Sequence, residues 1–245
     1  MCIKRIALLT ALSFLALSAR AAGYGENLVS NGGAEASAGV PNTSTSMMLP
    51  PAGWTVAGTL TAAQYGGSGG FPTAASPGPT ERGANFFAGG RGMGMMGGSV
   101  ATATQTISLA SFLGDIAGGK VAYSFSAWLG GYSNDNDRAE VSLSFLDGTS
   151  AVLGNVVLPA VWASDRLVAG SYVTGLWLRE AEGFVPAGSA SALITLSMTK
   201  ARGMYNDASA DNISLALSAP VPEPETYAMF LAGLGLLGRR LRRHR

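Results

Sequence analysis

The sequence predicts an all-β fold, a β-sandwich of about 200 residues, and three observations support this fold class. No stretch between the two ends of the chain keeps the period of about 3.6 residues that marks an amphipathic helix. Short runs of β-branched and aromatic residues are instead separated by turn-forming residues, and the 245-residue chain holds 34 Gly and 11 Pro. Apolar and polar residues largely alternate over 141–145 and 193–198, as in a strand with one buried face. This spacing favours a β-sandwich.

Residues 1–21 have the three parts of a secretory signal peptide. Lys4 and Arg5 precede an apolar run over 6–17, and small residues occupy the positions that a signal peptidase reads, up to Ala21. We therefore expect export, with signal peptidase as a partner and cleavage after Ala21. The expected organisation is a signal peptide (1–21), a β-sandwich domain (22–219) and a sorting and anchor segment (220–245).

The body of the chain reads as a series of short strands bounded by Gly, Pro, Asn and Asp. Residues 110–116 alone predict a short helical turn. We expect strands, in chain order, at 28–30, 54–56, 60–64, 85–88, 102–108, 120–130, 140–145, 151–157, 173–179, 192–199 and 212–217.

The C-terminal segment has three successive parts. It opens on Pro222, Glu223 and Pro224, so a helix can begin only after these prolines. The apolar run 227–238 follows and would span about 18 Å as a helix, short of the ~30 Å hydrocarbon core, so insertion requires snorkelling side chains or local bilayer thinning. A basic cluster closes the segment, and the positive-inside rule keeps it cytoplasmic and the domain on the far side of the membrane. The cluster contains Arg239, Arg240, Arg242 and Arg243.

This order of features resembles the PEP-CTERM sorting signal of Gram-negative, exopolysaccharide-producing bacteria, over residues 221–245. The resemblance implies recognition by an exosortase, a membrane-embedded cysteine transpeptidase that cuts near Pro222, Glu223 and Pro224. It implies a protein first anchored in the inner membrane facing the periplasm, then transferred to the cell surface or extracellular matrix. The same tail is also labelled an ice-binding-protein C-terminal domain, a label that describes the tail alone. An ordinary tail anchor that is never processed is the alternative.

Several stretches of the body resemble the galactose-binding-like jelly rolls of carbohydrate-binding modules. They are 27–35, 53–54, 85–90, 103–107, 123–132, 185–188 and 206–215. In those jelly rolls an Asn-Gly-x-x-Glu element in the first strand lies near an Asp of the last strand, and the two often bind a structural Ca²⁺. Carried over, the resemblance implies that Glu35 and Asp211 are metal ligands. The sequence departs from the family at Ala34, where the family usually has Phe; the alternative is that Asp211 caps a turn and Glu35 is solvated.

Charge and residue usage exclude several classes of function. Of the 16 basic residues, eight lie in the two ends, which leaves eight against 14 acidic residues between 22 and 224. A mildly acidic body does not attract phosphate backbones, so we expect no nucleic-acid partner. The only cysteine is Cys2 in the signal peptide and the only histidine is His244 in the tail. A Ser-His-Asp triad, a thiol nucleophile and a His- or Cys-ligated zinc are therefore excluded from the body.

Aromatic residues near strand ends are candidate sugar-binding groups, because their rings offer apolar faces with a polar edge. Tyr132 and Trp162 are the candidates, with core packing as the alternative. Trp128 lies inside a predicted strand, so we expect it in the core. The acidic segments 134–137 and 206–207 lack the spacing of an EF-hand and predict hairpin tips.

We therefore expect a non-catalytic, surface-displayed β-sandwich that binds or organises extracellular polysaccharide or matrix. One alternative is a carboxylate-dependent glycan-active enzyme, which needs two acidic groups about 5–10 Å apart in a cleft. Its candidate residues are Asp135, Asp137, Glu140, Glu180 and Glu182. The other alternative is a purely structural matrix protein without a small ligand. A groove with exposed aromatics would favour binding, and a paired-carboxylate cleft would favour catalysis.

Overall fold

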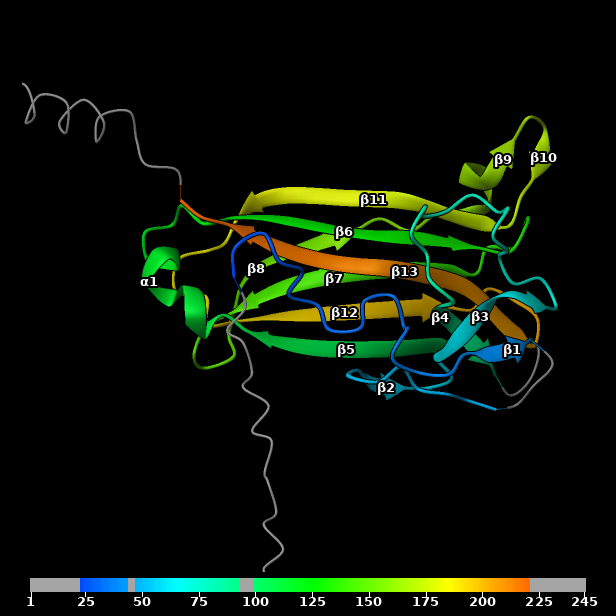
Figure 1. Cartoon of the computed structure of the whole chain (residues 1–245), viewed down its shortest axis with the longest axis horizontal. Coiled ribbons are helices and arrows are strands. Elements are labelled where there is room, and N and C mark those ends of the chain that lie inside the picture. Colours follow the sequence, from blue (N-terminus) through cyan, green and yellow to red (C-terminus); the bar gives the residue numbers. More distant parts are fainter. Residues whose placement is uncertain (1–22, 44–46, 93–98, 221–245) are drawn as a thin grey trace, which may run out of the picture.

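The computed structural model describes residues 23–43, 47–92 and 99–220. These residues form two packed β-sheets, as predicted (Figure 1). The predicted signal peptide and the sorting segment, with Pro222, Glu223, Pro224 and the four arginines, lie outside the described residues. Within the described part of the chain, no helix combines the length and the apolar character that spanning a membrane requires.

The first sheet has six strands and the second has five. In spatial order, the first contains β1 (Val40–Asn42), β3 (Thr61–Ser68), β4 (Asn85–Arg91), β13 (Tyr205–Ser218), β6 (Ala122–Gly131) and β11 (Gly175–Phe184). The second contains β2 (Thr55–Ala57), β5 (Val100–Ser108), β12 (Ser191–Thr199), β7 (Arg138–Leu146) and β8 (Val152–Leu158). The remaining elements are η1 (Ala110–Phe112), α1 (Leu113–Ile116), η2 (Ala163–Arg166), β9 (Leu167–Val168) and β10 (Ser171–Tyr172).

Four antiparallel strand pairs are nested along the chain. β7 pairs with β8, β6 with β11, β5 with β12 and β4 with β13. The innermost pair, β7 and β8, joins strands that are neighbours in sequence, and the outermost pair, β4 and β13, joins strands far apart in sequence. The chain therefore folds back on itself, and the nested pairs are distributed over both sheets. The connections between strands therefore gather at the two ends of the sandwich.

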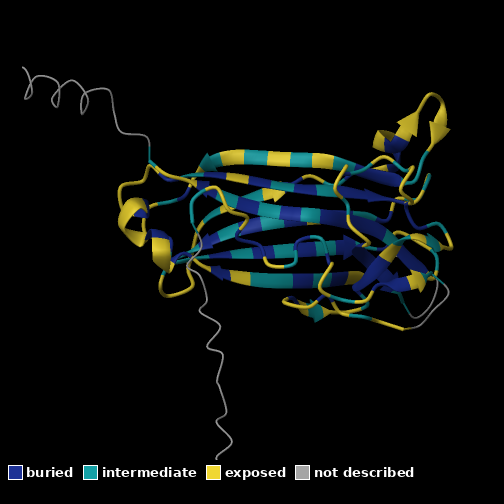
Figure 2. Ribbon diagram, viewed as in Figure 1, coloured by how far each residue is buried: buried dark blue, intermediate teal, exposed yellow. Residues whose placement is uncertain are grey.

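The core lies between the sheets because alternate residues of each strand face inward (Figure 2). In β6, Phe125, Ala127 and Leu129 are fully buried, and in β7 Leu143 and Phe145 meet them from the other sheet. Burying each large apolar side chain stabilises the fold by about 1.5–3 kcal/mol. The predicted alternation is thus confirmed in these strands.

Three sequence expectations are wrong in detail. Residues 28–30 form an irregular segment and no strand, because the Asn27 side-chain oxygen accepts the backbone N–H of Val29 at 3.0 Å and holds the segment beside β13. Trp128 lies on the outer side of β6 and is half-buried, since the inward positions of that strand are the odd-numbered ones. Residues 206–207 are not a hairpin tip but belong to the start of β13.

The two ends of the sandwich carry different elements. β13 ends at Ser218 beside Ala122, the first residue of β6, and α1 lies at the same end (Figure 1). We call this the α1 end. The opposite end carries the loops 132–137, 159–174 and 200–204, with the projecting hairpin of β9 and β10 (Figure 1). We call it the hairpin end.

Candidate functional site

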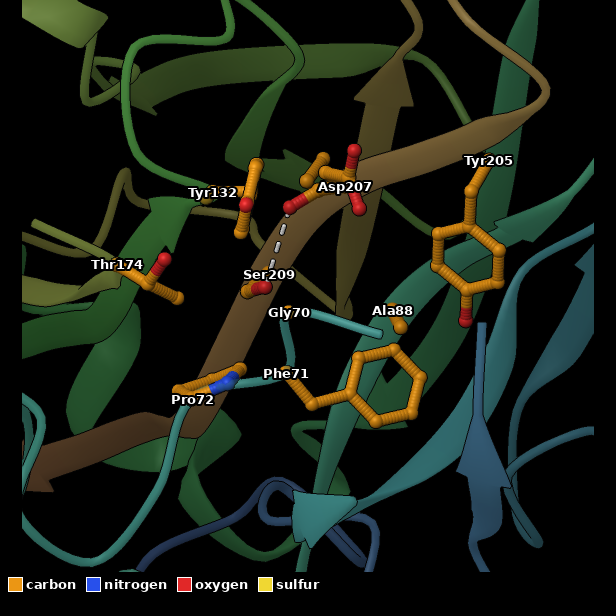
Figure 3. A pocket seen from close by; sticks show the side chains of 11 residues that line it. Gly70, Phe71, Pro72, Ala88, Tyr132, Thr174, Tyr205, Asp207 and Ser209 are labelled. Carbon is orange, nitrogen blue, oxygen red and sulfur yellow. Dashed lines mark hydrogen bonds between the residues drawn. The ribbon is translucent and has the colours of Figure 1, made fainter. Parts of the chain in front are cut away.

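A small pocket at the hairpin end brings together residues from three strands and a loop. Tyr132 follows β6, Thr174 precedes β11, and Tyr205 and Ser209 belong to β13 (Figure 3). The volume of the pocket is about 10 Å³, about enough for one water molecule. A sugar ring cannot enter it. The accessible part of this site is the rim, where Tyr132 is 42% exposed.

Tyr205 contributes a buried polar group to the lining of this pocket. Its hydroxyl has no hydrogen-bond partner among the described residues. Burial raises the pKa of Tyr205 above its ordinary value, with the charge of Asp207 as a smaller cause. The hydroxyl therefore stays neutral at ordinary pH and remains a hydrogen-bond donor.

Arg166 fixes the loops that carry Tyr132. Its guanidinium is fully buried and donates to the backbone carbonyls of Ser133 at 3.0 Å and Val161 at 3.1 Å. It also donates to the carbonyls of Tyr132 and Asp135. Burial lowers its pKa, against the opposing effect of nearby aspartates. Because a buried cation needs all its donors satisfied, Arg166 ties loop 132–137 to η2.

Three carboxylates converge next to this loop. One oxygen from each of Asp135, Asp137 and Asp207 lies within 4.8 Å of the other two. The fully buried Asp137 accepts the backbone N–H groups of Ala201 at 2.6 Å and Asp207 at 2.7 Å. Burial, opposed by these hydrogen bonds, raises the pKa of Asp137 to about 6. Burial and the charge of Asp137 raise the pKa of Asp207 to about 7. Near neutral pH the cluster is therefore suited to share a proton.

The candidate carboxylates for catalysis do not converge as a pair in a cleft. Of the five, only Asp135 and Asp137 lie together, and both oxygens of Asp137 accept buried backbone N–H groups. Glu140 lies on the outer side of β7 in the second sheet. Glu180 and Glu182 are exposed on β11 in the first sheet. Among these five residues, Asp135 and Asp137 are therefore the one pair that the structure brings together.

Trp162 is the second predicted aromatic residue, and it is 45% exposed just before η2. Its backbone N–H donates to the Asp165 carboxylate at 3.1 Å, which fixes the start of η2. The guanidinium carbon of Arg138 lies 4.7 Å from the centre of the indole ring. Trp162 does not line the Tyr132 pocket. Both predicted aromatics thus lie at the hairpin end.

Glu35 and Asp211, the predicted metal ligands, lie in one network beside β3 and β13. The Glu35 carboxylate accepts the backbone N–H of Ala84 at 3.0 Å and of Asn85 at 2.8 Å. The fully buried Asp211 accepts the Tyr65 hydroxyl at 2.7 Å. Burial, with the nearby charge of Glu35, raises the pKa of Asp211 to about 7, against the Tyr65 hydrogen bond that lowers it.

Both side chains offer carboxylate oxygens, the donor type that a hard cation prefers. Each of the four oxygens already accepts a hydrogen bond from the protein, so a cation would have to share or displace these contacts. A cation would most stabilise the charged form of Asp211, which burial disfavours. An open groove of about 530 Å³ adjoins the network, lined in part by Tyr65, Asn85 and Gln64.

Sequence reasoning missed Arg138 and Arg166 and gave Asp207 only a turn role. The partners of Arg166 are backbone carbonyls, which leave no pattern in the sequence. Asp137 and Asp207 are 70 positions apart, and they meet only because the loop before β7 and the start of β13 lie at the same end of the sandwich. The signal that was available is the clustering of Asn and Asp in both segments.

A family model described as the PEP-CTERM protein-sorting motif matches residues 220–245. The sequence prediction of this motif is confirmed. The motif implies exosortase processing, export and sorting to the cell surface. It covers the tail and leaves the function of the sandwich open.

Solved structures similar to the body share low identity with it. The enzymatically active domain of bacteriophage CBA120 tailspike protein 4 has 15% identity and a TM-score of 0.45, over 78% of this chain and 21% of that one. The CBM22-1 xylan-binding domain from Paenibacillus barcinonensis Xyn10C has 13% identity and a TM-score of 0.38, over 69% and 88%. A cyclase from Fischerella sp. TAU in complex with 4-(1H-indol-3-yl)butan-2-one has 14% identity and a TM-score of 0.45, over 72% and 90%.

The chain thus spans about a fifth of the length of the tailspike chain. A comparison with curated proteins finds no match. With identities and TM-scores this low, nothing about ligand or activity is carried over from the solved structures.

Proposed function

We propose that this protein is a sorted cell-surface protein whose β-sandwich binds extracellular polysaccharide at the hairpin end, without catalysing a reaction. The observation that carries the proposal is that the strand leading into the sorting motif ends at one end of the sandwich, whereas the exposed aromatic residues lie at the opposite end. β13 ends at the α1 end, from which the sorting motif follows, whereas Tyr132 and Trp162 are exposed at the hairpin end. A protein held by its sorting segment would therefore present these aromatic rings away from its attachment.

The nested strand pairs support a jelly-roll classification of the sandwich. At the hairpin end, Tyr132 offers an exposed ring beside the hydroxyl groups of Thr174 and Ser209. Aromatic faces with a few placed polar groups are the usual composition of small-ligand sites. A ligand would contact Tyr132 from outside, because the pocket itself is too small.

We place the protein first at the inner membrane, facing the periplasm, and then at the cell surface or in the extracellular matrix. The apolar run and the arginines of the tail support this order. Glu35 and Asp211 would hold a structural Ca²⁺ that joins the segment before β1 to β13. The ion would supply positive charge beside two carboxylates and take no part in ligand chemistry.

A glycan array tests the proposal with Tyr132→Ala, and Phe184→Ala serves as the matched control. Phe184 is 66% exposed at the end of β11, at the α1 end. We expect Tyr132→Ala to weaken binding to the array glycan that the wild type binds most tightly by about tenfold, since a central aromatic contact is worth more than 1 kcal/mol. Phe184→Ala should bind as the wild type does. A wild-type protein that binds no glycan, with intact folding, would instead favour the purely structural matrix protein.

A further inference from the structure

Basic residues of the body are concentrated at the hairpin end. The described residues contain eight basic and 13 acidic side chains. Six of the eight basic residues lie at or near the hairpin end, against six acidic ones, Asp135, Asp137, Glu140, Asp165, Asp207 and Asp211. The six are Arg91, Arg138, Arg166, Arg179, Lys200 and Arg202. The rest of the described body has two basic and seven acidic residues and would repel a polyanion.

Most of these cations are already engaged. Arg166 is buried among backbone carbonyls. Arg179 pairs with Asp165 at 3.1 Å, and Arg202 approaches Asp135 at 3.6 Å. Arg91 donates to the Thr43 carbonyl. Arg138 also has no described carboxylate within ion-pair distance, and its guanidinium lies over the Trp162 ring.

The place of Arg138 is fixed by the fold around it. It is the first residue of β7 and faces outward, since the next residue, Ala139, is fully buried. Trp162, its partner, is held by the Asp165 carboxylate, and the adjacent Ala163 N–H donates to the Asn136 side chain at 3.3 Å. A guanidinium placed over a ring keeps its donors at its edge, where a carboxylate or sulfate can accept two of them.

We propose that the ligand of the hairpin end is an anionic polysaccharide, with Arg138 pairing with an acidic group on a sugar and Trp162 contacting a sugar ring. This inference rests on the proposed function and names its ligand class. Attraction is local to the hairpin end, because the remainder of the body is acidic. Glu140 lies two residues further along the same outer face of β7 and opposes the attraction.

Affinity electrophoresis of the full chain in mild detergent tests the proposal with three probes. Polygalacturonate supplies carboxylates, dextran sulfate supplies sulfates, and dextran is neutral. We expect the chain to bind at least one anionic probe and not dextran, and the preferred probe identifies the anion. Salt should weaken the binding, as the Debye length falls from about 10 Å at 0.1 M to about 3 Å at 1 M.

Three variants locate the contact. Arg138→Gln should weaken binding to the preferred anionic probe about tenfold, because it removes a charge-assisted hydrogen-bonded pair. Lys120→Gln removes the same charge at the α1 end and should leave binding unchanged. Glu140→Gln should strengthen binding, because it removes an opposing charge.

Three results would overturn the inference. Equal binding to dextran and to both anionic probes, lost in Tyr132→Ala, would leave the proposed function standing and reject the anionic ligand. Equal effects of Arg138→Gln and Lys120→Gln would show that net charge acts without a site. Failure to retard on any of the three probes, and on any array glycan, would reject the proposed function as well.

Discussion

At the scale of single residues, a few buried charged groups organise the hairpin end. Arg166 uses its donors on backbone carbonyls, and Asp137 accepts N–H groups from the loop after β12 and from β13. The sequence predicted the exposed candidates Tyr132 and Trp162 from their place near strand ends. It could not predict Arg166 or the Asp137–Asp207 contact, because both depend on which distant loops meet at one end of the sandwich.

The aspartate cluster predicts how stability changes with pH. The folded protein raises the pKa of Asp137 to about 6 and of Asp207 to about 7, whereas an unfolded chain releases these protons near about 4. This contribution to stability is therefore complete at low pH and is lost as pH rises through about 6 to 7. We expect the melting temperature to fall between pH about 5.5 and about 8 for this reason.

Asp207→Asn should reduce that slope and raise the melting temperature at pH about 8 by about 2–4 °C, the shift that 1 kcal/mol produces in a domain of this size. Asp211, whose pKa burial also raises to about 7, keeps part of the slope in this variant. Asp147→Asn is the control, because Asp147 is on an exposed turn and its pKa is lowered, mainly by a hydrogen bond from Thr149. An unchanged slope in Asp207→Asn, measured by calorimetry, would contradict the prediction.

At the scale of elements, the strands with clear alternation were the predictable ones. Residues 140–145 and 192–199 were predicted within two positions of β7 and β12, because one buried face imposes the period. β1, β9 and β10 have only two or three residues each, too few to show a period, and they escaped prediction. Of the strands this short, β2 alone was predicted, at 54–56. β1 exists because Val40 pairs with Ala63 in β3, which is a tertiary contact with no local signal.

The calcium prediction concerns Glu35, in the segment before β1, and Asp211, in β13. A cation bound by Glu35 and Asp211 would exist only in the folded state, so it would stabilise the fold by roughly 2.7 kcal/mol at a hundredfold excess over its dissociation constant. We expect the melting temperature to rise with Ca²⁺ and to return with a chelator. Asp211→Ala should abolish the calcium-dependent difference, whatever it does to the baseline.

The variant Asp207→Asn tests whether the ion binds at the aspartate cluster of the hairpin end and not at Glu35 and Asp211. If Asp207→Asn removes the calcium response and Asp211→Ala keeps it, the ion binds at the aspartate cluster and the assignment to Glu35 and Asp211 is wrong. If the wild type melts identically with Ca²⁺ and with chelator, neither site stabilises the fold through Ca²⁺.

At the scale of the whole molecule, one strand runs from the hairpin end of the sandwich to the start of the sorting motif. β13 carries Asp207 near the hairpin end and ends at Ser218, and the matched sorting motif begins at residue 220. Only one residue separates the last strand from the motif. Under the proposed function, β13 would therefore connect the ligand-binding end of the sandwich to the sorting motif.

The C-terminal sorting segment leads to a prediction about membrane association and processing of the intact protein. Replacing Pro222, Glu223 and Pro224 by alanine should leave membrane association intact, because the apolar run 227–238 and the arginines remain. It should block processing, so the mature mass in an exosortase-positive host should exceed that of the wild type. Deleting 221–245 should release the sandwich in soluble form, as fractionation would show. A truncated protein that still sediments with membranes would reject the anchor, and an alanine variant with the wild-type mature mass would reject exosortase processing at this motif.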